Sequence, residues 1–146
     1  MTNRRRVASR GRSTAATVLA LAAVTSGLLA SPAHAQGTLR IAAYNIKHGE
    51  GMDGVVDLRR AADILRSLDA DVITLQEIDR GTERTDRVDQ ARRLGELLGM
   101  EAHFGDFMPY QGGEYGMAVL SRLPIRRVEN IRLPDGDEPR TALEVE

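Results

Sequence analysis

The sequence predicts an α/β domain in which two helices lie on one face of a mixed β-sheet. The chain has 146 residues, of which 42% are hydrophobic and 28% charged, as in ordinary globular proteins, and this length fits one domain at most. Beyond residue 35 the spacing of apolar residues alternates between the strand period and the helix period. After Gly99 only strand-like segments follow, and this order favours a mixed sheet with its helices on one side.

The first 35 residues have the pattern of an export signal. Five arginines and no acidic residue precede an apolar run over residues 15–30, and a small-x-small site ends at Ala35. We expect cleavage after Ala35, a secreted or extracytoplasmic protein, and no stable membrane span after cleavage. The apolar run is short for a membrane helix, so an uncleaved anchor is the less favoured alternative. Arg4-Arg5 also fits a twin-arginine signal, and both export routes stay open.

Composition excludes several chemistries for residues 36–146. The chain has no cysteine, which rules out a disulfide framework, a thiolate zinc site and a cysteine nucleophile. Five of its 20 basic residues precede residue 36, which leaves 15 against 21 acidic residues and a net charge near -6. This balance argues against a protein that coats nucleic acid by neutralising phosphates, although a local basic cleft stays possible.

The first half of the domain alternates strands with helices. The spacing predicts a strand over 39–46, a helix over 57–68, a short buried strand over 72–75 and a helix over 88–98. Asp57 is expected to cap the first helix at its N-terminus, and Gly99 is expected to stop the second. These two helices are amphipathic, so each should bury one face against the sheet.

The second half is predicted to contain strands alone. Their expected ranges are 102–107, 115–121, 126–133 and 142–145, separated by Pro109, Gly112-Gly113, Pro124 and Pro134-Asp135-Gly136. We expect all four to join the sheet of the first half. No later element would then cover the second face of that sheet, so we interpret residues 36–146 as an incomplete domain.

A glycine pattern after the first strand resembles a dinucleotide-binding fingerprint. Residues 49–54 read G-x-G-x-x-G, and Glu77 lies near the distance of a ribose-binding acid. However, the helix starts only near Asp57, and Glu50 and Asp53 would repel a pyrophosphate. We therefore interpret residues 49–54 as a flexible glycine loop.

Polar side chains follow two strands that are expected to be neighbours. Asn45 ends the first strand, and Glu77 follows the short strand at 72–75. In open α/β sheets the carboxyl ends of strands line the ligand crevice, where an amide and a carboxylate suit a hard cation and a phosphate. The alternative is that Asn45 caps a turn and Glu77 is solvated.

Four segments together resemble the N-terminal motifs of the endonuclease/exonuclease/phosphatase (DNase I-like) superfamily. They are Ala43–Ile46, Leu75–Asp79, Tyr110–Ile125 and Glu138–Leu143, and the resemblance covers residues 38–146. It implies half of a four-layer α/β/β/α sandwich, with helices outside two sheets. It also implies hydrolysis of phosphodiesters or phosphomonoesters with Mg²⁺, or with Mn²⁺ or Ca²⁺.

The resemblance assigns roles to individual residues. Glu77 matches the metal-binding glutamate, Asn45 the amide that supports the metal and phosphate site, and Arg140 a basic residue that contacts substrate phosphate. The predicted catalytic residues are therefore Asn45, Glu77 and Arg140. His48 is a further candidate for substrate binding because it follows Asn45 by three residues.

Other residues of the motifs are expected to be structural or depart from the family. Gly116 should allow a close backbone approach, and Ser121 and Arg122 should end a strand before a proline turn. Met117 stands where an asparagine is common in related sequences. His103 is interpreted as a surface or strand-edge histidine.

These observations predict an exported, divalent-metal-dependent phosphohydrolase fragment that is inactive by itself. The family's Asp-x-Asn and Asp-His motifs do not occur in residues 1–146. The substrate stays open among nucleic acid, a phospholipid headgroup such as that of sphingomyelin, and a small phosphodiester, and no obligate partner is evident. The alternative is a noncatalytic module that binds a divalent ion or a partner.

Overall fold

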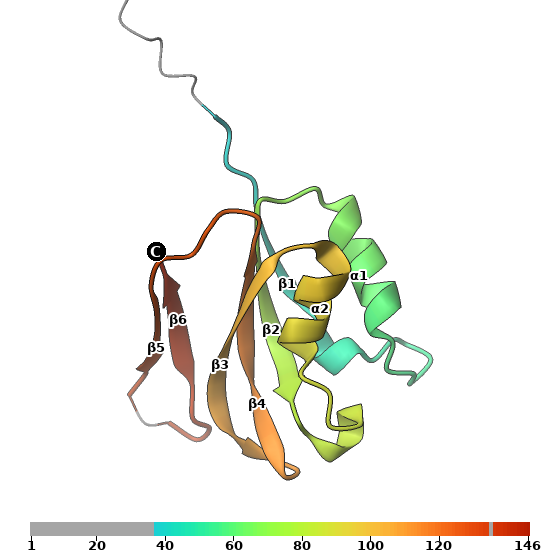
Figure 1. The fold of residues 1–146 in the computed structure, drawn as a ribbon. Coiled ribbons are helices and arrows are strands. Elements are labelled where there is room, and N and C mark those ends of the chain that lie inside the picture. The colour runs from blue at the N-terminus through green and yellow to red at the C-terminus, as the bar shows by residue number, and fades with distance from the viewer. Residues whose placement is uncertain (1–36, 135) are drawn as a thin grey trace, which may run out of the picture. The chain divides into compact units, whose positions relative to one another are not determined.

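A computed structural model of the chain describes residues 37–134 and 136–146 (Figure 1). The predicted signal peptide lies outside the described residues. The described residues form a four-stranded sheet with two helices and a separate two-stranded sheet. Among them no helix is both long enough and apolar enough to cross a membrane.

The four-stranded sheet is mixed, as predicted. Its strands are β1 (Ile41–Asn45), β2 (Val72–Arg80), β3 (Glu101–Tyr110) and β4 (Gly113–Ser121). They lie in the order β1-β2-β4-β3, with β1 parallel to β2 and the other two pairs antiparallel. The β1 and β2 strands, which carry Asn45 and Glu77, are therefore neighbours.

Both helices lie on the same face of this sheet (Figure 1). They are α1 (Leu58–Ser67) and α2 (Gln90–Leu98), and single turns of 3-10 helix occur at η1 (Lys47–Gly49) and η2 (Glu83–Thr85). Asp57 caps α1, since its Oδ1 accepts hydrogen bonds from the backbone N–H groups of Arg59 and Arg60 at 2.9 and 3.1 Å. Gly99 ends α2 with φ +68°, so both terminal signals are confirmed.

The core lies between the helices and the sheet. Ile73 and Leu75 of β2 and Leu120 of β4 are no more than 1% exposed, as are Leu65 of α1 and Leu94 of α2. Full burial of each such side chain stabilises the fold by about 1.5–3 kcal/mol. The alternating residues of β1 on the other face, Ile41, Ala43 and Asn45, are exposed.

The last two strands do not join this sheet, so the prediction of one sheet for all strands is wrong. β5 (Val128–Arg132) and β6 (Thr141–Val145) pair only with each other. This hairpin packs against β3 because Gly105 has no side chain: a Cβ there would lie 2.9 Å from Asn130 Oδ1 and 3.1 Å from Leu143 Cδ1. The side chains of Asn130 and Thr141 both donate to the carbonyl of Asp106, at 3.1 and 3.2 Å.

Two strands continue well past their predicted ends. β2 does not end at Leu75 but continues to Arg80, and Pro109 lies within β3 instead of separating two strands. A proline is tolerated there because β3 is an edge strand of the sheet. The close approach predicted at Gly116 is confirmed, since a Cβ there would lie 2.1 Å from the carbonyl oxygen of Gly105.

The glycine loop at residues 49–54 is closed by its own hydrogen bonds. The Gly51 N–H donates to the carbonyl of Val55 at 3.0 Å, and the Asp57 N–H donates to that of Gly49 at 3.0 Å. An ion pair between Arg60 and Asp53, at 2.8 Å, fastens the loop to α1. The loop is therefore tied down at both ends and at its tip.

Candidate active site

Asn45 and Glu77 lie side by side, as expected for residues of adjacent strands. Asn45 Nδ2 donates to Glu77 Oε1 at 2.7 Å, and Asn45 Oδ1 accepts from the Lys47 N–H at 3.0 Å. Asn45 thus caps the turn after β1, as the alternative held, and also fixes the carboxylate of Glu77. The two interpretations of Asn45 are compatible.

Glu77 does not follow the end of its strand but forms a β-bulge inside it. The pairing of β2 with β4 passes from Gln76 to Ile78, and Glu77 has φ +57°. A left-handed conformation costs a non-glycine residue about 1–2 kcal/mol. Bulges re-aim side chains, and backbone strain clusters at functional sites. Here the bulge places the carboxylate beside Asn45.

A pocket of about 250 Å³ opens beside this carboxylate. Its walls come from the turn after β1, the bulge of β2, η2, the adjoining ends of β3 and β4, and the segment before β6. The lining residues are Lys47, His48, Glu77, Arg84, Met108, Tyr110, Tyr115 and Glu138. The structure therefore brings His48 together with Glu77 in one pocket.

The side chain of His48 is almost buried, with 11% of its surface exposed. Its Nε2 lies 3.0 Å from Glu50 Oε2, and its backbone carbonyl accepts a hydrogen bond from Gln90 Nε2 at 2.8 Å. Hydrogen bonds from Lys47 and then from His48 lower the pKa of Glu50. These contacts fix the imidazole at the wall of the pocket. His103, by contrast, lies in edge strand β3 beside Glu101, as interpreted.

Arg140 does not line the pocket of Glu77. It lines an adjacent pocket of about 200 Å³, and Met108 belongs to the walls of both. Its guanidinium pairs with Glu138 and lies 5.0 Å from the centre of the Phe107 ring. Arg140, which was predicted to contact the substrate phosphate, thus lies at the edge of the site and not at its centre.

Tyr115 stands among the charges of the two pockets. Burial is the largest cause that raises its pKa, followed by the negative charge of Glu77, while Arg140 and Arg84 act in the opposite direction. Its ring lies 6.2 Å from that of Tyr110, centre to centre. One wall of the pocket is therefore aromatic.

The residues present fit a divalent cation at Glu77. One carboxylate oxygen is held by Asn45, and within the described ranges the other oxygen accepts no hydrogen bond. Residues 37–134 and 136–146 contain no cluster of three or more His, Cys, Asp or Glu able to hold a metal. A single carboxylate still suits Mg²⁺, which keeps several waters and takes further oxygens from a phosphate substrate. Asn45 fits the same site as the group that orients Glu77.

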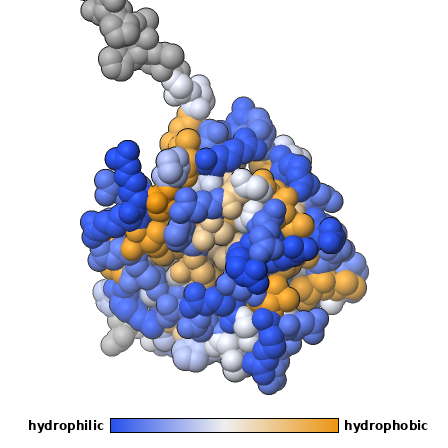
Figure 2. Space-filling model, viewed as in Figure 1, coloured by the Kyte–Doolittle hydropathy of each residue, from blue (hydrophilic) through white to orange (hydrophobic). Residues whose placement is uncertain are grey.

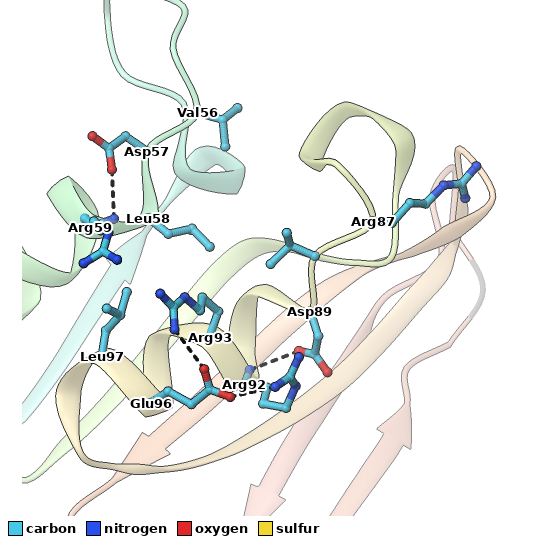
Figure 3. A pocket seen from close by; sticks show the side chains of 11 residues that line it. Val56, Asp57, Leu58, Arg59, Arg87, Asp89, Arg92, Arg93, Glu96 and Leu97 are labelled. Carbon is cyan, nitrogen blue, oxygen red and sulfur yellow. Dashed lines mark hydrogen bonds and ion pairs between the residues drawn. The ribbon is translucent and has the colours of Figure 1, made fainter.

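A larger pocket, of about 630 Å³, contains none of the predicted site residues (Figure 3). It lies between the start of α1 and helix α2, and several of the charged side chains that line it pair with one another. Glu96 contacts Arg92 at 2.6 Å and Arg93 at 3.0 Å, and Asp89 caps α2 through the Arg92 N–H. Because these pairs occupy the acidic side chains on α2, and none of the predicted site residues lines this pocket, we assign no site there.

The chain belongs to the Endonuclease/Exonuclease/phosphatase family, whose sequence profile matches residues 42–146. Members of this family are hydrolases that act on phosphate esters, and they generally use divalent metals. A comparison with curated proteins finds no match. The resemblance of the four motifs to this superfamily is thereby confirmed.

Solved structures with the same fold include two bacterial proteins of this name. The endonuclease/exonuclease/phosphatase from Beutenbergia cavernae is 28% identical with a TM-score of 0.57, and the match covers 73% of this chain and 33% of that one. A family protein from Leptotrichia buccalis is 16% identical with a TM-score of 0.56, covering 74% and 49%. The chain thus matches a third of one relative and half of the other.

Arg84 also lines the pocket of Glu77 and was not among the predicted site residues. Arg84 lies seven residues after Glu77, in η2, outside all four motifs. The sequence feature that comes nearest to indicating Arg84 is Asp79, an acidic residue directly after the apolar Ile78. The fold buries Asp79 completely. A buried carboxylate requires a cationic partner, and that requirement points to a nearby arginine.

Proposed function

We propose that this chain supplies the glutamate side of the active site of an exported, divalent-metal-dependent phosphohydrolase, acting on phosphodiesters or phosphomonoesters. The observation that carries the proposal is the strained bulge at Glu77, whose carboxylate is held by Asn45 at 2.7 Å beside a pocket. The family supports the class of reaction.

Each side chain has a distinct task in this proposal. Glu77 holds Mg²⁺, or Mn²⁺ or Ca²⁺, through its carboxylate, and Asn45 orients that carboxylate. Held there, a cation would supply Lewis-acid polarisation of the phosphoryl oxygen and stabilisation of charge on the leaving group. His48 and Arg140 are proposed to contact the substrate phosphate from the pocket and from its edge, respectively.

The net charge of residues 36–146 favours some substrate classes over others. With a net charge near -6 for residues 36–146, long-range attraction of nucleic acid is weak. We therefore favour a phospholipid headgroup or a small phosphodiester over DNA or RNA. Strong, salt-sensitive cleavage of DNA in a parallel assay with RNA, sphingomyelin and a chromogenic phosphodiester would reverse this preference.

Metal removal and one substitution test the proposal. The protein encoded by the full reading frame is assayed on these substrates with and without a chelator, and as Glu77→Gln, which keeps the shape and removes the charge. We expect both treatments to abolish turnover, and calorimetry to show weaker Mg²⁺ binding by the variant. Glu96→Gln is the matched control, because Glu96 is a surface carboxylate that pairs with arginines on α2. Unchanged turnover after chelation and in Glu77→Gln would contradict the proposal.

The export proposal rests on the pattern of residues 1–35 and needs its own test. We expect the protein recovered from outside the cytoplasm to begin at residue 36, as N-terminal sequencing would show. A secreted form that retains Arg4-Arg5 would exclude cleavage at Ala35.

A further inference from the structure

Asp79 is a buried carboxylate that serves to hold one arginine. Its side chain is 0% exposed, and both of its oxygens accept from Arg84, at 2.7 Å from Nε and 2.8 Å from Nη2. Thr82 Oγ1 donates a further hydrogen bond to Asp79 Oδ2 at 2.7 Å. Removing a carboxylate from water is costly, and a two-pronged arginine pair with additional donors is the arrangement that offsets this cost. Arg84 is thereby fixed in one orientation.

The plane of the Arg84 guanidinium is fixed as well. It lies over the ring of Tyr110, 4.5 Å from the ring centre, and 5.6 Å from the centre of the Tyr115 ring. Cation–π contacts of this kind restrain a guanidinium that two hydrogen bonds already orient. The Arg84 side chain is therefore already ordered, and it would lose little conformational freedom on binding a ligand.

One end of this guanidinium has no partner. Among the described residues Nη1 makes no hydrogen bond, although Nε and Nη2 both do. The side chain keeps 26% of its surface exposed, and Arg84 lines the same pocket as Glu77 and His48. Arg84 therefore combines unused hydrogen-bond donors with a place in the wall of the pocket, which a pair serving stability alone would not require.

The pocket offers few other fixed cationic donors. Lys47 also lines it, but its Nζ pairs with Glu50 at 3.2 Å and its side chain is 58% exposed. An exposed lysine of this kind is mobile and contributes little directional binding. An oxyanion placed between Glu77 and the tyrosines would therefore find its most rigid donor in Arg84.

We propose that Arg84 is a substrate-binding residue whose Nη1 donates to a non-bridging phosphoryl oxygen of the ester in the Glu77 pocket. This inference rests on the proposed function and assigns Asp79 as the residue that positions Arg84. Because Asp79 offsets the charge of Arg84, the contribution is a short-range, directed hydrogen bond and not long-range attraction. The effect of Arg84 on substrate binding should then depend only weakly on salt.

Arg84→Lys is the first test, in the protein encoded by the full reading frame. Lysine keeps a positive charge beside Asp79 but lacks the donor fork. We expect KM for the substrate and the inhibition constant of inorganic phosphate to rise about tenfold each, with kcat changed less than about threefold. Binding of inorganic phosphate by calorimetry should weaken to the same extent. Arg92→Lys is the matched control, since that surface arginine pairs with Glu96 on α2, and should change none of these values.

A second variant guards against a purely structural effect. Arg84→Met combined with Asp79→Asn removes both charges together, so no uncompensated carboxylate stays buried. A folded double variant with weakened phosphate binding supports the proposal, and wild-type phosphate affinity in either folded variant overturns it. If neither variant folds, a crystal structure of the wild-type protein with inorganic phosphate decides, by whether Arg84 Nη1 contacts the phosphate. Turnover that persists in Arg84→Lys with unchanged KM overturns this inference alone, whereas absence of any metal-dependent turnover in the wild type overturns the proposed function.

Discussion

At the scale of single residues, the position of Glu77 in a β-bulge is indicated by a break in the alternation of buried apolar residues along β2. Ile73 and Leu75 are buried at the second and fourth positions of β2, but the next buried apolar residue is Ile78, at the seventh position. Such a change of phase inside one strand requires one inserted residue, which is Glu77. Identity and approximate position of the glutamate were predictable, whereas its left-handed backbone was not, because nothing local in the residues Gln76 to Ile78 favours positive φ.

The strain at Glu77 makes a prediction about stability. In Glu77→Ala the carboxylate is lost and positive φ is kept, whereas in Glu77→Gly the strain is relieved as well. We expect the glycine variant to be the more stable of the two by about 1 kcal/mol in urea unfolding. Glu129 provides the control, since it is an exposed residue of β5 without positive φ. There the order should reverse, with glycine less stable than alanine by about 0.5–1 kcal/mol. A Glu77→Gly variant that is less stable than Glu77→Ala by as much as the Glu129 pair differs would show that the bulge stores no strain.

At the scale of elements, those whose signals are local were predicted and those that depend on distant partners were not. The helices α1 and α2 begin at capping aspartates and repeat apolar residues at helical spacing, so a short window of sequence defines them. The β5–β6 hairpin, in contrast, packs on β3 outside the sheet, where Gly105 leaves room for the side chains of Asn130 and Leu143. Its strand period is the same in either position, so sequence spacing alone does not distinguish them. Arg84 escaped prediction for the same reason: Asp79 and Tyr110 reach it only in the folded chain.

An ion pair between Asp53 and Arg60 contributes to the attachment of the glycine loop at residues 49–54 to α1. The hydrogen bond from Arg60 is the largest cause that lowers the pKa of Asp53, from 3.8 to about 2. A lowered carboxylate pKa contributes stability that is fully present above 3.8 and is lost as pH falls through about 2. Asp53→Asn should therefore lower the thermal midpoint near neutral pH, and the two midpoints should converge near pH 2.

The control for this titration is Asp63→Asn. Asp63 also pairs with an arginine, Arg66, but both residues lie on α1 and join no loop to it. We expect a smaller change in the thermal midpoint near neutral pH than in Asp53→Asn. A wild-type and Asp53→Asn difference that stays constant from neutral pH down to pH 2 would show that the Asp53–Arg60 pair does not fasten the loop.

At the scale of the whole described domain, the two faces of the four-stranded sheet are covered unequally. The two helices pack over one face and bury its core side chains, whereas on the other face the hairpin packs mainly against β3 and β4. Ile41 of β1 is 62% exposed on that second face, and β1 is also an edge strand. Figure 2 shows apolar surface beside the start of the described chain, interrupted by hydrophilic side chains. The expectation of a sheet with one open face thus holds for β1, although the hairpin reduces it over β3 and β4.

This open face predicts self-association of residues 36–146. An exposed apolar residue on an unpaired edge strand favours contact with a second copy, and the apolar area it buries drives that contact. We expect the segment to form dimers or larger species in sedimentation experiments. We also expect no Mg²⁺-dependent turnover of a chromogenic phosphodiester, since Glu77, Asn45 and Arg140 offer no evident group to orient the attacking water. Ile41→Glu should shift the population toward monomer by placing a charge on the face. Met52→Glu should not, although Met52 is 104% exposed, because it lies at the tip of the glycine loop and away from the sheet. A segment that stays monomeric at high concentration, unfolds cooperatively and turns over the substrate would contradict this prediction and the interpretation of an incomplete domain together.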